Sequence, residues 1–105
     1  MEINFDKEYL RELYEMGESR DKNCRFQPEV VKRYQARIVT LERVSKPEDL
    51  YMFRFLRYEK LKGDKAGLES IRVNDQYRIE FKTTRVVSET VVTICNILEL
   101  SNHYK

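Results

Sequence analysis

The sequence predicts an α+β fold, in which N-terminal helices pack on one face of a small, mostly antiparallel four-stranded sheet. Apolar residues recur every three or four positions up to about residue 51, as on one face of a helix. From residue 52 onward apolar and polar residues mostly alternate, as in strands. The helical segments all precede the strands, and this order is typical of an α+β domain.

Three helical segments are predicted in the first half of the chain. The first covers residues 5–16, and Gly17 is suited to end it. The second covers residues 28–41, with proline at its first position. A capping-box pattern opens the third, a short helical segment over residues 45–51.

About four strands are predicted in the second half. The first covers residues 53–62 and ends at a turn, residues 63–67, that has glycine at both ends. A hairpin follows over residues 70–81, and then a polar loop near residues 83–89. The last strand, residues 91–98, is apolar at nearly every position, as expected of a strand covered on both faces.

The hairpin has the sequence SIRVNDQYRIEF, in which every odd-numbered position from 71 to 81 outside the turn is apolar. If these residues share one buried face, a three-residue loop pairs residue 73 with 77 and 71 with 79. Arg72 then lies directly opposite Arg78 on the exposed face. Two like charges in such a pair repel each other, so the pair needs a partner or a function.

The turn at residues 63–67 can place Lys62 opposite Leu68, which puts Tyr58 opposite Arg72. Several cations and one aromatic ring then project from the open face: Tyr58, Lys60, Lys62, Arg72 and Arg78. This set suits a phosphate backbone with a base stacked nearby. An alternative needs no ligand: Glu80 lies on the same face and can form an ion ladder with the arginines.

Composition narrows the class of protein. The chain has 105 residues, enough for one domain over residues 1–105, and a net charge of +2. Residues 1–51 hold 10 basic and 11 acidic side chains, and residues 52–105 hold 10 and 7, so only a local basic patch is available. The chain has neither a membrane-spanning apolar stretch nor a signal-peptide core, which predicts a cytoplasmic protein that does not bind membranes.

Cofactor chemistry is not indicated. Cys24 and Cys95 lie far apart in the chain and are interpreted as reduced structural thiols. We find no phosphate-cradling glycine loop and no cluster of residues with metal-ligand spacing, so no metal or other cofactor is expected. His103 is the only histidine, and its ordinary pKa suits proton transfer near neutrality.

Residues 58–81 read YEKLKGDKAGLESIRVNDQYRIEF. This block resembles the signature region of the RelE/ParE superfamily of bacterial toxins, in particular the HigB-like killer proteins. The resemblance implies a small antiparallel sheet backed by N-terminal helices. It also implies a ribosome-dependent ribonuclease that cleaves messenger RNA, an mRNA interferase.

The resemblance implies partners as well. A cognate HigA-like antitoxin with a helix-turn-helix region is expected to neutralise the toxin. The toxin would act on mRNA at the ribosome, and it would contact operator DNA only through the antitoxin complex.

Site residues follow by position in the motif. The lysine of the LKGD turn is Lys62, and the arginine after an aromatic residue in the hairpin is Arg78. Arg72 replaces the family's second arginine, which in some members lies at the position of Asn74. The C-terminal histidine corresponds to His103.

Supporting roles fall to neighbouring residues. Tyr104 stands in for the aromatic residue of the family's C-terminal tail. Glu59 and Lys60 occupy the neighbourhood in which some members carry a further histidine.

The implied mechanism needs no metal, because the RNA's own 2′-hydroxyl attacks the adjacent phosphate. Arg72 and Arg78 would stabilise the developing charge, and His103 would protonate the leaving oxygen. Lys62 would bind phosphate or serve as the base, with Glu59 as the other candidate base.

Two other functions remain open from the sequence. ParE-like relatives poison DNA gyrase and need no acid–base pair. A non-catalytic RNA- or protein-binding module would use the arginines only in structural ion pairs with Glu80.

Overall fold

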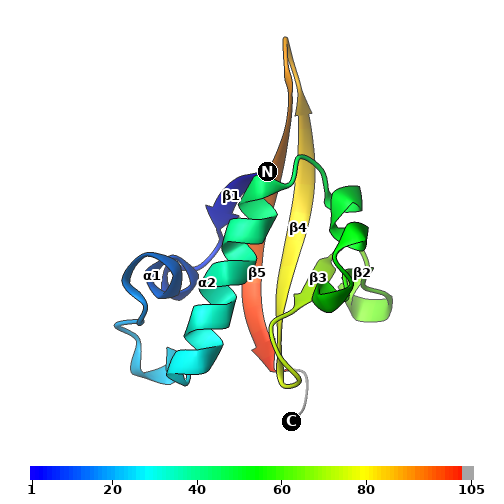
Figure 1. Ribbon diagram of the computed structural model, residues 1–105. Coiled ribbons are helices and arrows are strands. Elements are labelled where there is room, and N and C mark those ends of the chain that lie inside the picture. Colours follow the sequence, from blue (N-terminus) through cyan, green and yellow to red (C-terminus); the bar gives the residue numbers. More distant parts are fainter. Residues whose placement is uncertain (103–105) are drawn as a thin grey trace.

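The computed structural model describes residues 1–102, which form a five-stranded sheet with helices on one face (Figure 1). The strands are β1 (Glu2–Phe5), β2 (Glu59–Lys60), β3 (Glu69–Arg72), β4 (Tyr77–Val87) and β5 (Val91–Asn102). They lie in the order β1-β5-β4-β3-β2, with β1 parallel to β5 and the other neighbouring pairs antiparallel. The predicted α+β class is confirmed, with one strand more than the four expected.

Within residues 1–102 the covering layer consists of two α-helices, α1 (Glu8–Met16) and α2 (Pro28–Arg43), and α2 crosses in front of the sheet (Figure 1). The described part of the chain also contains four short 3₁₀ helices: η1 (Lys22–Cys24), η2 (Pro47–Met52), η3 (Arg54–Leu56) and η4 (Gly63–Lys65). Four buried residues of α2 recur at helical spacing and form the apolar stripe that the sequence predicts: Val31, Tyr34, Ile38 and Leu41. Val30 is buried as well. The apolar period therefore determines which side of α2 meets the sheet.

Gly17 ends α1, as the sequence predicts. It has a φ of 77°, a left-handed conformation that glycine adopts at little cost. The amide of Gln35 then donates to the carbonyl oxygens of Leu13 (3.1 Å) and Tyr14 (3.2 Å), which have no partner within the helix. A side chain of α2 thus fixes the end of α1 against it.

Three details differ from the sequence prediction. Residues 2–5 form β1 beside β5, so α1 begins only at Glu8. The segment predicted as one strand over residues 53–62 contains the 3₁₀ helix η3 and irregular backbone, and β2 has only two residues. The predicted loop at 83–89 is largely strand, because β4 and β5 pair as far as Val87 and Val91.

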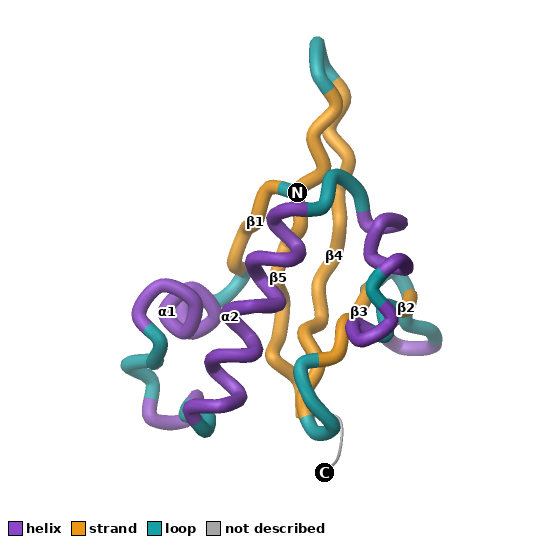
Figure 2. The backbone as a smooth tube through the Cα atoms, in the orientation of Figure 1, coloured by secondary structure: helices purple, strands orange, loops and turns teal. Residues whose placement is uncertain are grey.

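The outer part of the β4–β5 hairpin extends beyond the helices (Figure 2). Its four valines are 38–67% exposed: Val86, Val87, Val91 and Val92. A register shift lies between Glu80 and Phe81, where β5 carries one extra residue. Across residues 1–102, no helix combines the length and the apolar character needed to cross a membrane.

Candidate active site

The two arginines face each other as the sequence predicts. Arg72 of β3 pairs with Arg78 of β4, Ile71 pairs with Ile79, and the backbone N–H of Val73 donates to the carbonyl of Tyr77 (3.0 Å). Ile71 and Ile79 are fully buried, so the arginines project from the opposite face of the sheet. The alternating pattern and the short loop therefore fixed the register correctly.

Arg78 is held across the neighbouring strands by three polar contacts. Its Nε donates to the hydroxyl of Ser70 (3.0 Å), and its Nη2 donates to the carbonyl of Arg57 (2.8 Å). Nη2 also lies 3.5 Å from a carboxylate oxygen of Glu59. Only 14% of the side chain is exposed, and Nη1 has no hydrogen-bond partner among residues 1–102. The guanidinium is thus fixed in place, with one donor group that the described residues leave available.

Arg72 is held more loosely. Its side chain forms an ion pair with Asp75 in the hairpin turn and is 26% exposed. Its backbone carbonyl accepts a hydrogen bond from Nε of Arg37 in α2 (3.0 Å). The Arg72 carbonyl thus has a hydrogen-bond partner even though β2 is too short to pair with this end of β3.

Glu80 does not bridge the two arginines. Its carboxylate forms a 2.6 Å ion pair with Lys65 of η4. Arg72 and Arg78 have separate acidic partners, Asp75 and Glu59. The ion ladder centred on Glu80 is therefore wrong, although each arginine does have a carboxylate nearby.

The predicted register of β2 is wrong by one residue. Glu59 pairs with Ser70 and Lys60 with Glu69, so Glu59, rather than Tyr58, shares the face of Arg78. Two 3₁₀ helices precede β2, and Arg57 between η3 and β2 has a left-handed φ of 46°. These breaks in strand geometry shift the phase of the alternation, which the sequence pattern could not reveal.

Tyr58 consequently points into the core and is 8% exposed. Its hydroxyl donates to Glu69, and burial, followed by this hydrogen bond, raises the pKa of Tyr58 above its ordinary value. The interpretation of Tyr58 as an exposed stacking platform is therefore wrong. Lys60 and Lys62 are both exposed, and Lys62 lies just before η4. Lys60 pairs with the buried Glu69, so the prediction that it shares the face of Arg72 and Arg78 is wrong.

Sequence reasoning missed the buried carboxylate of Glu69. Besides Tyr58, it accepts hydrogen bonds from the backbone N–H (3.1 Å) and the hydroxyl (2.8 Å) of Thr83. Glu69 is 6% exposed and links the start of β2 with β3 and β4. The sequence does contain a signal that Glu69 is buried. Alternate residues of a strand share one face, so Glu69 lies on the same face as the core residues Ile71 and Val73.

His103 and Tyr104 lie outside the described residues. The described chain ends with Ser101 opposite Arg78 and Asn102 opposite Tyr77.

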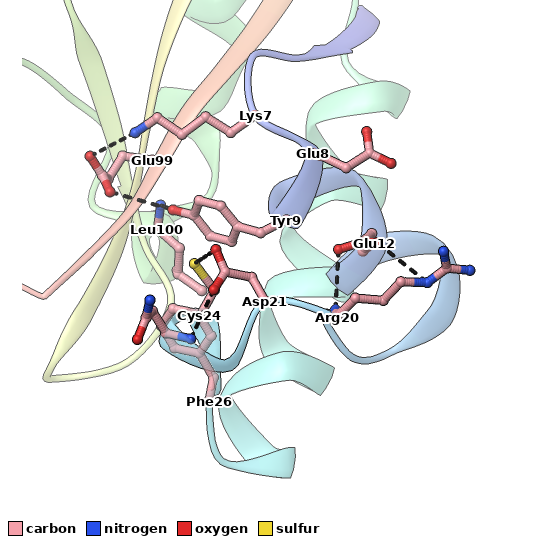
Figure 3. A pocket seen from close by; sticks show the side chains of 11 residues that line it. Lys7, Glu8, Tyr9, Glu12, Arg20, Asp21, Cys24, Phe26, Glu99 and Leu100 are labelled. Carbon is pink, nitrogen blue, oxygen red and sulfur yellow. Dashed lines mark hydrogen bonds and ion pairs between the residues drawn. The ribbon is translucent and has the colours of Figure 1, made fainter.

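A separate hollow of about 770 Å³ lies between α1, η1 and the end of β5 (Figure 3). There Glu99 accepts hydrogen bonds from Lys7 (3.3 Å) and from the hydroxyl of Tyr9 (3.4 Å). Burial raises the pKa of Tyr9 to about 12 and that of the Cys24 thiol above its usual range. Both groups stay protonated near neutral pH, so the hollow offers no reactive thiolate, and its contacts fasten α1 to β5.

Both cysteines are free thiols, as predicted. Cys95 is fully buried in β5, and burial raises the pKa of its thiol to about 12.

A family model described as the RelE-like toxin of the type II toxin-antitoxin system HigB matches residues 3–94. This chain belongs to the HigB-like toxin family. The match covers β1 through the start of β5 and includes both arginines and the LKGD turn. As a toxin of a type II system, a HigB-like protein has a cognate antitoxin.

Among solved structures, the HigB-like chain is similar to the YoeB/ParE toxin from Agrobacterium tumefaciens. The TM-score is 0.54 at 18% sequence identity, and the alignment covers 99% of this chain and 100% of the other. At this identity the similarity shows a shared fold. No curated protein sequence matched the chain.

Proposed function

We propose that this toxin is a ribosome-dependent mRNA endonuclease that inhibits translation by cleaving messages as they are read. The observation that carries the proposal is the facing pair of arginines, with the Arg78 guanidinium anchored on Ser70 and Arg57 and its Nη1 bonded to no residue among 1–102. A planar guanidinium with a free donor group matches a phosphate oxygen, and its fixed position costs no reorganisation during reaction.

The proposed reaction is an internal transfer at phosphorus. The 2′-hydroxyl of the RNA attacks the adjacent phosphate, a base accepts its proton, and an acid protonates the departing 5′ oxygen. Arg72 and Arg78 stabilise the charge that builds on the phosphate oxygens. We assign the acid to His103, which lies three residues beyond Leu100 in β5.

The base is assigned to Glu59 or Lys62. The Glu59 carboxylate lies 3.5 Å from the Arg78 guanidinium, and its side chain is 56% exposed. Lys62 is an exposed cation between β2 and η4, so it also suits phosphate binding. Lys60 is an exposed cation on the edge strand and adds to the attraction for RNA.

The buried residues support the site indirectly. Tyr58 anchors β2 to β3 and β4 through Glu69, so we assign it a positioning role in place of base stacking. Tyr104 is proposed to assist His103. We propose further that residues 1–105 form a single toxin domain, which acts in the cytoplasm on translating ribosomes and is neutralised by a HigA-like antitoxin.

The decisive experiment is induced expression without antitoxin, followed by mapping of transcript 5′ ends with translation active and with translation blocked. New ends should appear only in translated messages. Arg78→Ala should lower the cleavage rate by about 10²–10³-fold, as expected on loss of one fixed donor to a developing oxyanion.

Arg85→Ala is the matched control, because Arg85 is an exposed arginine of the same strand far from the site. It should cleave like the wild type. Growth arrest without new transcript ends, unchanged by His103→Ala, would favour a ParE-like action on gyrase and contradict the ribonuclease proposal.

A further inference from the structure

Residues 51–57, YMFRFLR, expose an unusual amount of aromatic and apolar surface. Tyr51, Met52, Phe53 and Phe55 are 60%, 79%, 37% and 52% exposed. Only Leu56 of this segment is buried. The fold does not require this surface, because the core beneath it is filled by Leu50 and Leu56. We call residues 51–57 the aromatic segment.

Two of the rings are held in a defined arrangement. Phe53 and Phe55 lie with their ring centroids 6.1 Å apart at an interplanar angle of 69°. The guanidinium carbon of Arg37 lies 4.9 Å from the centroid of Phe55, a cation–π contact. One side of Phe55 is therefore covered by Arg37, and about half of the residue stays open to solvent.

The surroundings of these rings are strongly cationic. Arg33 and Arg37 of α2, and Arg54 and Arg57 of the aromatic segment, form no ion pair with any described residue. Burial, and then the nearby charges of Arg33 and Arg72, lower the pKa of Arg37. Cations gathered without acidic partners favour an anionic ligand.

Two backbone contacts connect the aromatic segment to the arginine pair. The carbonyl of Arg57 accepts from Arg78, and Arg37, which covers Phe55, donates to the carbonyl of Arg72. Arg78 is thus hydrogen-bonded to the aromatic segment itself, and Arg72 is hydrogen-bonded to Arg37, which covers Phe55.

We propose that Phe53 and Phe55, backed by Arg37, form a stacking site for a base of the single-stranded RNA whose scissile phosphate lies at Arg72 and Arg78. Arg54 and Arg57 bind the flanking phosphates. This inference rests on the proposed ribonuclease function and adds to it a subsite that selects and positions the nucleotide beside the cleaved bond.

The interleaving of rings and guanidinium groups favours RNA over a protein partner. Single-stranded nucleic acids are bound by aromatic faces that stack bases and by cations that follow the backbone. A protein docking surface needs neither this repeated positive charge nor a ring already backed by arginine.

The test uses ribosomes stalled on a defined mRNA and single-turnover cleavage over a range of toxin concentrations. Phe55→Leu keeps an apolar side chain but removes the ring. It should raise the half-saturating toxin concentration by about 5- to 100-fold, as expected for loss of one base–aromatic stack. The cleavage rate at saturation should stay within about threefold, since the stack holds the substrate in ground and transition states alike.

Three controls make the result specific. Phe55→Trp keeps a stacking face and should retain wild-type behaviour, and Val87→Ala tests an exposed apolar residue at the far end of the molecule. In the third, single abasic nucleotides are placed on either side of the cleavage site. One of them should weaken the wild type as much as Phe55→Leu does and should have no further effect in that variant.

Wild-type cleavage with an unchanged half-saturating concentration in Phe55→Leu would overturn the stacking site and leave the ribonuclease proposal standing. Additive effects of Phe55→Leu and every abasic position would also overturn it, and the exposed rings would then serve a protein partner. Absence of cleavage by the wild type would overturn the proposed function and the stacking site together.

Discussion

The two ends of β4 share one strand but differ in their surroundings. Around Arg78 the strand lies between β5 and β3, its inward residues Ile79 and Phe81 are fully buried, and its outward side chains have fixed polar partners. Around Val87 the same strand pairs only with β5 and exposes apolar side chains. The fixed geometry of the arginines therefore comes from the neighbouring strands and the core below them.

The largest difference between the two ends should appear in stability. Ile79→Ala removes a fully buried side chain beneath the arginine pair, and should lower the free energy of unfolding by about 2–5 kcal/mol. Val87→Ala, at 67% exposure, should change it by no more than about 0.5 kcal/mol. Urea unfolding followed by circular dichroism measures both, and equal effects would contradict the comparison.

A smaller effect is expected from the polar network that braces the site end of β4. Tyr58→Phe removes the donor to Glu69 but leaves the two bonds from Thr83, and should cost about 1–2 kcal/mol of unfolding free energy. Tyr51→Phe is the matched control, because Tyr51 is 60% exposed. If Tyr58→Phe is as stable as this control, Glu69 is braced by Thr83 alone.

The smallest effect on stability at neutral pH is expected from the Cys95 thiol. Cys95 pairs with Thr83, at the boundary between the covered and the exposed parts of β4. Its thiol has a pKa near 9.0 in the unfolded chain and about 12 in the folded protein. The folded state therefore binds the proton more tightly, so this contribution to stability is complete below pH 9 and is lost as the pH rises toward 12.

Unfolding measured from pH 8 to pH 12 should show this loss in the wild type and a shallower slope in Cys95→Ala. Because Cys95→Ala also creates a cavity, the slopes and not the absolute stabilities are compared. Identical slopes would mean that the Cys95 thiol ionises as readily in the folded protein as in the unfolded chain.

The sequence was sufficient where local pattern and turn chemistry agree. In the 70–81 hairpin the alternation sets the faces, and the side chain of Asn74 accepts hydrogen bonds from the N–H groups of Gln76 (2.9 Å) and Tyr77 (2.7 Å), which closes the three-residue loop. The facing arginines follow from these local facts. The amphipathic stripe of α2 was predicted for the same reason.

The sequence was insufficient where distant segments decide the structure. β1 has four residues and pairs only with β5, more than 90 positions along the chain, so no local signal marks it. In the aromatic segment the alternation of rings and arginines imitates a strand, but Phe53 and Phe55 face solvent and Leu56 faces the core. The roles of the site residues themselves remain predictions, with Arg78 the best supported by its surroundings.

The left-handed backbone of Arg57 has a consequence for protein engineering. Its carbonyl accepts a hydrogen bond from Arg78, so the backbone conformation at this position matters to the proposed catalysis, and its side chain matters separately to the proposed binding of RNA. Glycine adopts this conformation without strain, so Arg57→Gly should retain the anchor for Arg78 while removing one surface cation. Substitution at this one position should thus change the affinity for the proposed RNA substrate without changing the cleavage rate, which offers a route to toxins of graded potency.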